Sequence, residues 1–210
     1  MIISKENKYI FIHIPKNSGT SIEASLTGAQ QWKAEEKHMT TLECRAKYGA
    51  DLWLEFFTFC VVRNPWDRLV SQFRFSGKIW CKRHFGKLLS FNEFVTEIVA
   101  KGLPFSGHDY LSKTGAQSGD TNWQQISRIT DENGQIMIDY VARFENLALD
   151  YEIICDRLGL SGQLQHLNTS AFEARPYWEY YTEETASIVA TVCADDIESF
   201  GYSFGESAVS

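Results

Sequence analysis

The chain has 210 residues, a net charge of -7 at pH 7 and an apolar share of 44%. This length favours one domain, residues 1–210, over two, and the apolar share is ample for a single core. The acidic balance argues against broad affinity for nucleic acid or anionic membranes, because both attract basic surfaces. Since no run approaches the ~20 apolar residues of a membrane span, and five cysteines without CxxC spacing fit a reducing compartment, we expect a cytoplasmic protein.

The first part of the sequence predicts a strand, a loop and a helix. Tyr9–Ile14 is a run of β-branched and aromatic residues, typical of a buried strand. Ile22 and Leu26 then share one helical face, and Ser18 is the expected N-cap of that helix. Backbone N–H groups at such a turn, together with the helix dipole, form an anion site that Lys16 would complete.

A polar, charged segment follows and contains His38. Thr40 or Thr41 is expected to cap a helix that continues toward Tyr48 and stops at Gly49. His38 would therefore lie in the loop before that helix, where catalytic residues are often found. The other early histidine, His13, falls inside the first strand and is interpreted as a buried, hydrogen-bonded residue.

The strongest strand is Phe56–Val62, a continuous apolar run typical of the centre of a parallel sheet. Arg63 follows at its carboxyl end, and Asn64 and Pro65 are favourable helix start signals. Ser71 comes two helical turns later. Open α/β sheets bind ligands at the carboxyl ends of their strands, so Arg63 and Ser71 would both reach one ligand.

The rest of the chain alternates helices with less regular segments. Their order predicts an α/β fold with a mainly parallel sheet. The expected elements are a helix over Phe91–Ala100, a long loop over Gly102–Gly119, a hairpin at Asn133-Gly134 between Ile126–Thr130 and Gln135–Ile138, a strand over Tyr140–Phe144, a helix from Asn146 to Gly159, and a last helix over Glu183–Phe200.

The opening loop lacks the Gly-Lys-Ser/Thr of a nucleoside triphosphate P-loop. The run Pro15–Ser21 after a strand resembles instead the 5′-phosphosulfate loop of sulfotransferases that use 3′-phosphoadenosine-5′-phosphosulfate (PAPS). The run Val61–Ser71 resembles the 3′-phosphate segment of the same family, in the branch with Golgi-type carbohydrate sulfotransferases and bacterial relatives. Arg143–Leu147, Leu167–Ser170 and Asp195–Tyr202 agree as well, so the resemblance spans nearly the whole chain.

The resemblance implies a P-loop-NTPase-like three-layer fold and PAPS as sulfate donor, with no metal required. His38 would be the general base, and Lys16 would stabilise the leaving group. An acceptor hydroxyl of a carbohydrate or another small molecule would receive the sulfuryl group. The residues implied to hold the nucleotide are Lys16, Asn17, Ser18, Gly19, Thr20, Ser21, Arg63, Ser71, Asn168 and Ser170.

The sequence leaves further candidate residues and alternative functions open. Gln117 and Trp123 would line the acceptor site beside His38, although a Trp beside a hairpin is more often part of a core. His84 and His108 are weaker candidates for the base. The alternative functions are a P-loop-like kinase that uses ATP, which the missing Gly-Lys pair disfavours, and a nucleotide-binding module without catalytic activity.

Overall fold

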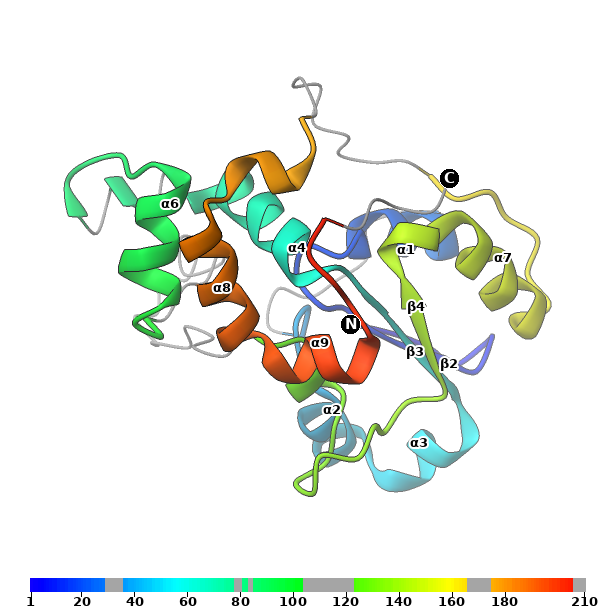
Figure 1. The fold of residues 1–210 in the computed structure, drawn as a ribbon. Coiled ribbons are helices and arrows are strands. Elements are labelled where there is room, and N and C mark those ends of the chain that lie inside the picture. Colours follow the sequence, from blue (N-terminus) through cyan, green and yellow to red (C-terminus); the bar gives the residue numbers. More distant parts are fainter. Residues whose placement is uncertain (29–35, 78–80, 83–84, 104–122, 166–174, 206–210) are drawn as a thin grey trace. The chain divides into compact units, whose positions relative to one another are not determined.

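The computed structural model describes residues 1–28, 36–77, 81–82, 85–103, 123–165 and 175–205 (Figure 1). These residues form two compact units. The first lies within residues 1–63 and 125–165, and the second within 64–124 and 175–205. The prediction that residues 1–210 fold as one domain stays a prediction.

A four-stranded sheet is the centre of the first unit. Strands β2, β3 and β4 are parallel, and β1 pairs antiparallel with β2 at the edge. The mainly parallel sheet predicted from the sequence is therefore confirmed. In the order of the sheet the strands are β1 (Ile2–Ser4), β2 (Tyr9–Ile12), β3 (Phe57–Val62) and β4 (Tyr140–Arg143).

Helices flank this sheet on both sides (Figure 1). Helices α1 (Gly19–Thr27) and α7 (Leu147–Leu158) cover one face, while α2 (Thr41–Tyr48) and α3 (Ala50–Glu55) lie on the other side. The three-layer α/β arrangement is thus confirmed. Alternate strand residues meet the helices in one apolar core, whose members include Tyr9, Phe11, Ile22, Phe59, Val61, Tyr151 and Ile154.

Local capping signals fix several helix ends where the sequence predicts them. Thr40 and Glu43 form a reciprocal capping box at the start of α2, and Gly49 follows its last residue. The Asn64 side chain accepts a hydrogen bond from the N–H of Trp66, with Pro65 at the first position of α4 (Pro65–Gln72). These caps place the residues before them, including Arg63, outside the helices.

The first strand and the predicted hairpin differ from expectation. Strand β2 ends at Ile12, so His13 is buried just beyond the strand rather than inside it. The hairpin strands are wrong, because Ile126–Arg128 forms a 3₁₀ turn (η3) and Thr130 meets Ile136 only through an isolated bridge. Where the chain reverses direction, Asp131 Oδ1 accepts hydrogen bonds from the backbone N–H groups of Asn133 at 2.9 Å and Gln135 at 2.8 Å. These bonds favour a tight turn over paired strands.

Helices dominate the described part of the second unit. Helix α4 continues into a π-helical turn, η1 (Phe73–Gly77), and α6 (Phe91–Phe94) continues into another, η2 (Val95–Val99). The predicted last helix is broken at Cys193, which separates α8 (Glu183–Val192) from α9 (Ala194–Phe200), and a short 3₁₀ turn, η5 (Tyr177–Tyr180), precedes them. An apolar stripe of α4 and η1 is buried, made of Trp66, Leu69, Val70 and Phe73.

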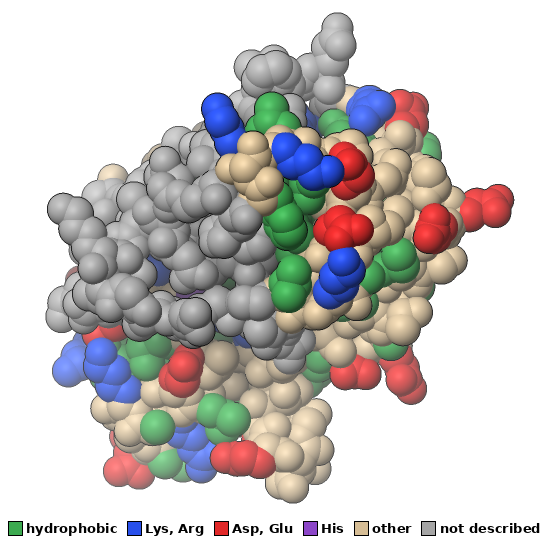
Figure 2. All heavy atoms as spheres, turned by 90° about the vertical axis from the view of Figure 1, so that its left-hand side faces the viewer, with side chains coloured by type: hydrophobic (Ala, Val, Ile, Leu, Met, Phe, Trp, Pro, Cys, Tyr) green, Lys and Arg blue, Asp and Glu red, His purple; other side chains and the backbone are tan. Residues whose placement is uncertain are grey.

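All five cysteines are buried and free. Burial raises the pKa of the Cys44 thiol to about 11, so this thiol stays protonated at neutral pH. Across the part of the chain that the structure describes, no helix is long and apolar enough to cross a membrane. On the face shown in Figure 2, acidic and basic side chains are interspersed over the described surface.

Candidate active site

The loop between β2 and α1 has an unusual backbone. Lys16 and Ser18 both adopt the left-handed conformation, with φ of 70° and 58°. Ser18 occupies the N-cap position, yet its side chain makes no capping bond. Within the described ranges the N–H groups of Gly19 and Thr20 have no acceptor, because the first helical bonds run from Ser21 and Ile22 to the Ser18 carbonyl. The start of α1 therefore keeps donors available for an anion.

Gly19 is required where it stands because the His13 ring packs against its α-carbon. A Cβ at this position would lie 2.1 Å from His13 Nε2. His13 is held in turn by Glu23 of α1, whose Oε1 lies 2.8 Å from Nδ1, and both side chains are buried. The prediction of a buried, hydrogen-bonded His13 is confirmed, and the glycine lets the loop approach it closely.

We expect Gly19→Ala to lower the free energy of unfolding by about 1–3 kcal/mol through overpacking against His13, and to weaken anion binding at the loop. Gly28→Ala is the control, because Gly28 ends the same helix at φ 69° with nothing within 4 Å of an added Cβ. It should destabilise by about 1–2 kcal/mol through backbone strain alone and leave anion binding unchanged. Thermal unfolding and phosphate titration of both variants test this, and equal anion affinity would contradict it.

Arg63 leaves the carboxyl end of β3 and turns toward the loop. Its Nη1 donates to the Lys16 carbonyl at 3.1 Å, and its guanidinium stacks over the Phe144 ring at 3.8 Å from the ring centre. Phe144 directly follows β4, which pairs with β3 so that Val62 lies opposite Arg143. Three parallel strand ends thus bring Lys16, Arg63 and Phe144 together, as open α/β sheets do at their ligand edge.

Positive charge is concentrated at this edge. The Lys16 pKa is lowered to about 8, first by desolvation and then by the nearby charges of Arg63 and Lys37. Lys37 is itself buried, and desolvation lowers its pKa too. Lys37 has the buried carboxylate of Glu23 nearby as a counter-charge. Lys16 and Arg63 carry like charges, and an anion bound between them would relieve their repulsion, so the site suits a multiply charged anion.

His38 lies in the turn before α2, with its ring edge-on to that of His13. Its Nδ1 is 3.2 Å from the His13 carbonyl oxygen, and its own carbonyl accepts a bond from Arg128 Nη1 at 2.9 Å. Because a carbonyl can only accept, Nδ1 carries the proton, and the neutral ring has its lone pair on Nε2. This is the tautomer that a general base using Nε2 needs.

Two buried amides that sequence reasoning undervalued connect the loop to β3. Asn17 Nδ2 donates to the Val61 carbonyl at 2.7 Å and to Gln125 Oε1 at 2.6 Å. Asn17 Oδ1 is buried without a hydrogen-bond partner among the described residues. Asn17 was expected at the nucleotide, and that contact stays a prediction. Gln125 had no distinguishing local pattern, since its partners lie more than 60 residues away in the sequence.

The remaining predicted residues fall elsewhere. Thr20 and Ser21 lie on the first turn of α1, in the same unit as Lys16 and Arg63. Ser71 lies on α4 and Trp123 is buried with its ring near Phe94, both in the second unit. Their predicted contacts with ligand stay predictions. Five further candidates lie outside the described residues, namely Gln117, Asn168, Ser170 and the weaker base candidates His84 and His108.

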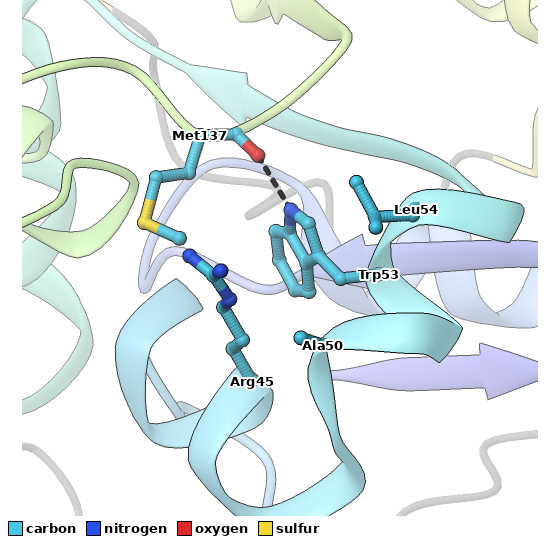
Figure 3. A pocket seen from close by; sticks show the side chains of 5 residues that line it. All are labelled: Arg45, Ala50, Trp53, Leu54 and Met137. Carbon is cyan, nitrogen blue, oxygen red and sulfur yellow. Dashed lines mark hydrogen bonds between the residues drawn. The ribbon is translucent and has the colours of Figure 1, made fainter.

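A separate shallow pocket of about 210 Å³ lies beside α2 and α3 (Figure 3). The Trp53 indole N–H closes one side by donating to the Met137 carbonyl at 2.8 Å. Its volume is below the ~300–1,000 Å³ of sites for drug-sized ligands, and none of the predicted site residues lines it. Its lining residues are Arg45, Ala50, Trp53, Leu54 and Met137.

Among the described residues there is also no group of three His, Cys, Asp or Glu placed to hold a metal ion.

Comparison with known proteins adds an independent finding. The profile of the sulfotransferase family matches residues 1–202. The chain is also 25% identical over 134 residues to an uncharacterized protein of Archaeoglobus fulgidus, which covers 60% of this chain and 88% of that relative. No solved structure matches.

Proposed function

Because the chain belongs to the sulfotransferase family, we propose that it transfers a sulfuryl group from PAPS to a hydroxyl of a carbohydrate or another small acceptor. One observation carries the proposal: an uncapped helix start, Lys16 and Arg63 converge at one edge of the sheet in an otherwise acidic chain. Five free cysteines make the cytoplasm the proposed compartment.

The hydrogen-bond donors and cations of the site suit a nucleotide with two separate anionic ends. The N–H groups of Gly19 and Thr20, with the Lys16 ammonium, would hold the 5′-phosphosulfate. Arg63, whose planar guanidinium presents a fork of donors, would hold the 3′-phosphate together with Ser71. Asn168 and Ser170 would add contacts to the nucleotide.

PAPS supplies a sulfuryl group on a phosphate leaving group. His38 Nε2 would take the proton of the acceptor hydroxyl as its oxygen forms a bond to sulfur. The sulfur–oxygen bond to the 5′-phosphate breaks in the same displacement, and Lys16 and the α1 N–H groups would stabilise the charge left on that oxygen. The products are a sulfated acceptor, 3′-phosphoadenosine-5′-phosphate (PAP) and a protonated His38. Gln117 and Trp123 would border the acceptor.

Transfer from PAPS labelled in its sulfate group tests the activity. The protein is incubated with a mixture of sugars, phenols and alcohols, with and without a chelator of divalent metals. We expect label in at least one acceptor in both conditions. Transfer of phosphate from ATP with Mg²⁺, and none of sulfate, would establish a kinase instead. Tight binding of PAP with no transfer to any acceptor would indicate a non-catalytic module.

The lowered pKa of Lys16 predicts how affinity depends on pH. An anion favours the charged ammonium, so binding raises the pKa of Lys16 from about 8, and above that pH binding must take up a proton. Affinity for PAP should therefore fall by only about twofold between pH 7 and 8 and then approach a tenfold fall per pH unit. Lys16→Arg, which keeps its charge throughout, should remove this slope. Titration calorimetry from pH 7 to 9.5 tests it, and a parallel decline in both proteins would contradict it.

A further inference from the structure

We infer that Gln125 is a positioning residue that holds the Lys16 loop and Arg63 in one fixed arrangement. The inference rests on the proposed function, since it concerns how that site would hold the two ends of one nucleotide. Gln125 is 0% exposed and directly precedes η3. It belongs to the same compact unit as Lys16 and Arg63.

The Gln125 amide satisfies both backbone groups of Arg63. Its Nε2 donates to the Arg63 carbonyl at 2.8 Å, and its Oε1 accepts from the Arg63 N–H at 2.9 Å. A neighbouring strand would make the same pair of bonds, but β3 ends one residue earlier, at Val62. Gln125 therefore replaces a strand partner where the backbone must direct the Arg63 side chain toward the loop.

The same amide reaches into the loop. Gln125 Oε1 accepts a second bond, from Asn17 Nδ2 at 2.6 Å, and that nitrogen also donates to the Val61 carbonyl. Asn17 is 1% exposed and lies between Lys16 and Ser18, the two residues of left-handed φ. The strained loop conformation is thus tied to the end of β3 by two buried amides.

This arrangement has a consequence for binding. Lys16 and Arg63 carry like charges that lower the pKa of Lys16, so they would move apart if nothing held them. A fixed spacing lets both contact one ligand without reorganisation, and this makes their contributions depend on each other. Gln125 need not touch the nucleotide to have this effect.

A double-mutant cycle measures that dependence. PAP is titrated by calorimetry into Lys16→Ala, Arg63→Ala and the double variant, each with Gln125 intact and with Gln125→Leu. With Gln125 intact, we expect the double variant to lose about tenfold less affinity than the product of the two single losses. In the Gln125→Leu background the losses should multiply. The same discrepancy in both backgrounds would overturn the inference.

Two further variants separate positioning from general destabilisation. Thr58→Val is the matched control, because Thr58 is buried in β3 and makes a similar pair of side-chain bonds with Asp139, at 2.9 Å each. It should destabilise the fold and leave the coupling intact. Gln125→Glu keeps both acceptor bonds and loses the donor to the Arg63 carbonyl, so it should show intermediate coupling. If Gln125→Leu does not fold, the cycle is measured in the Gln125→Glu background instead. Coupling as strong there as with Gln125 intact would count against the inference.

Hydrogen exchange in the ligand-free protein distinguishes this inference from the proposed function. If the unaltered protein binds no PAP, the proposed function fails, and exchange at the Arg63 amide decides the role of Gln125. We expect Gln125→Leu, which removes the acceptor of the Arg63 N–H, to speed exchange at Arg63 by about tenfold or more relative to Thr58→Val, and Gln125→Glu, which keeps that acceptor, to speed it less. Equal exchange at Arg63 in all these variants would overturn the positioning role.

Discussion

His38→Ala should lower kcat by about 10²–10⁴-fold and leave the affinity for PAP within about twofold of the unaltered protein. The proton that His38 Nε2 would accept belongs to the acceptor, and the nucleotide would be held by Lys16 and Arg63 instead. Single-turnover transfer from labelled PAPS gives the rate, and calorimetry gives the affinity.

His38→Asn is the matched control. Its amide can still donate toward the His13 carbonyl, as Nδ1 does at 3.2 Å, but it cannot accept a proton. It should be as slow as His38→Ala with a more native stability. If His38→Asn restored turnover, His38 would be a positioning residue. Undiminished turnover in both variants would move the base to another group, with His84 and His108 as the histidines to test next.

Arg63→Ala should weaken PAP binding by about 10–100-fold, the loss expected for charge-assisted hydrogen bonds at a partly buried site. The effect should depend on the 3′-phosphate. AMP lacks that group, so its affinity should change little, and the preference of the protein for PAP over AMP should largely disappear. Competition titrations of the two nucleotides measure this preference directly.

Two substitutions test whether the loss is specific to Arg63. Arg157→Ala removes another guanidinium that stacks on an aromatic ring of the same unit, 4.5 Å above Phe57, and should leave PAP affinity unchanged. Arg63→Lys keeps the charge but loses the planar fork and the stacking on Phe144, so its affinity should be intermediate. If Arg63→Ala lost the same affinity for PAP and for AMP, Arg63 would not bind the 3′-phosphate.

Local signals explain why much of the fold could be predicted. The apolar run before Arg63 specifies β3 without reference to the rest of the chain, and Asn64 with Pro65 starts α4 for steric and hydrogen-bonding reasons. The position of Arg63 at a strand end follows from those two signals alone. The family match over residues 1–202 agrees with the resemblance first seen in the two phosphate segments.

Errors arose where a side chain from a distant part of the sequence decides the backbone. Ile126–Thr130 was expected to be a hairpin strand, yet Ile126–Arg128 bends into η3 directly after Gln125, whose amide is bonded to the Arg63 backbone. The left-handed φ of Lys16 could not be predicted either, because residues with a long side chain rarely adopt this backbone conformation. Strand β1 was missed because three residues carry too little periodicity.

The acceptor cannot be predicted from the same kind of pattern. The phosphate-binding roles proposed for Lys16, Gly19 and Arg63 rest on residue type and spacing, which the chemistry of phosphate binding constrains. Acceptor recognition depends instead on the shape of a surface assembled from separate segments. Trp123 illustrates this, since its buried ring belongs to the apolar packing of the second unit.

Titration of PAP into the ligand-free protein, with AMP and ATP in parallel and with and without Mg²⁺, is the most direct test of the paired phosphate segments. We expect one site per chain, PAP bound more tightly than AMP, and no requirement for Mg²⁺. Lys16→Ala should weaken PAP and AMP alike, since both carry a 5′-phosphate. No binding of PAP, or a preference for ATP with Mg²⁺, would contradict the assignment of the Lys16 loop and Arg63 to the two ends of PAPS.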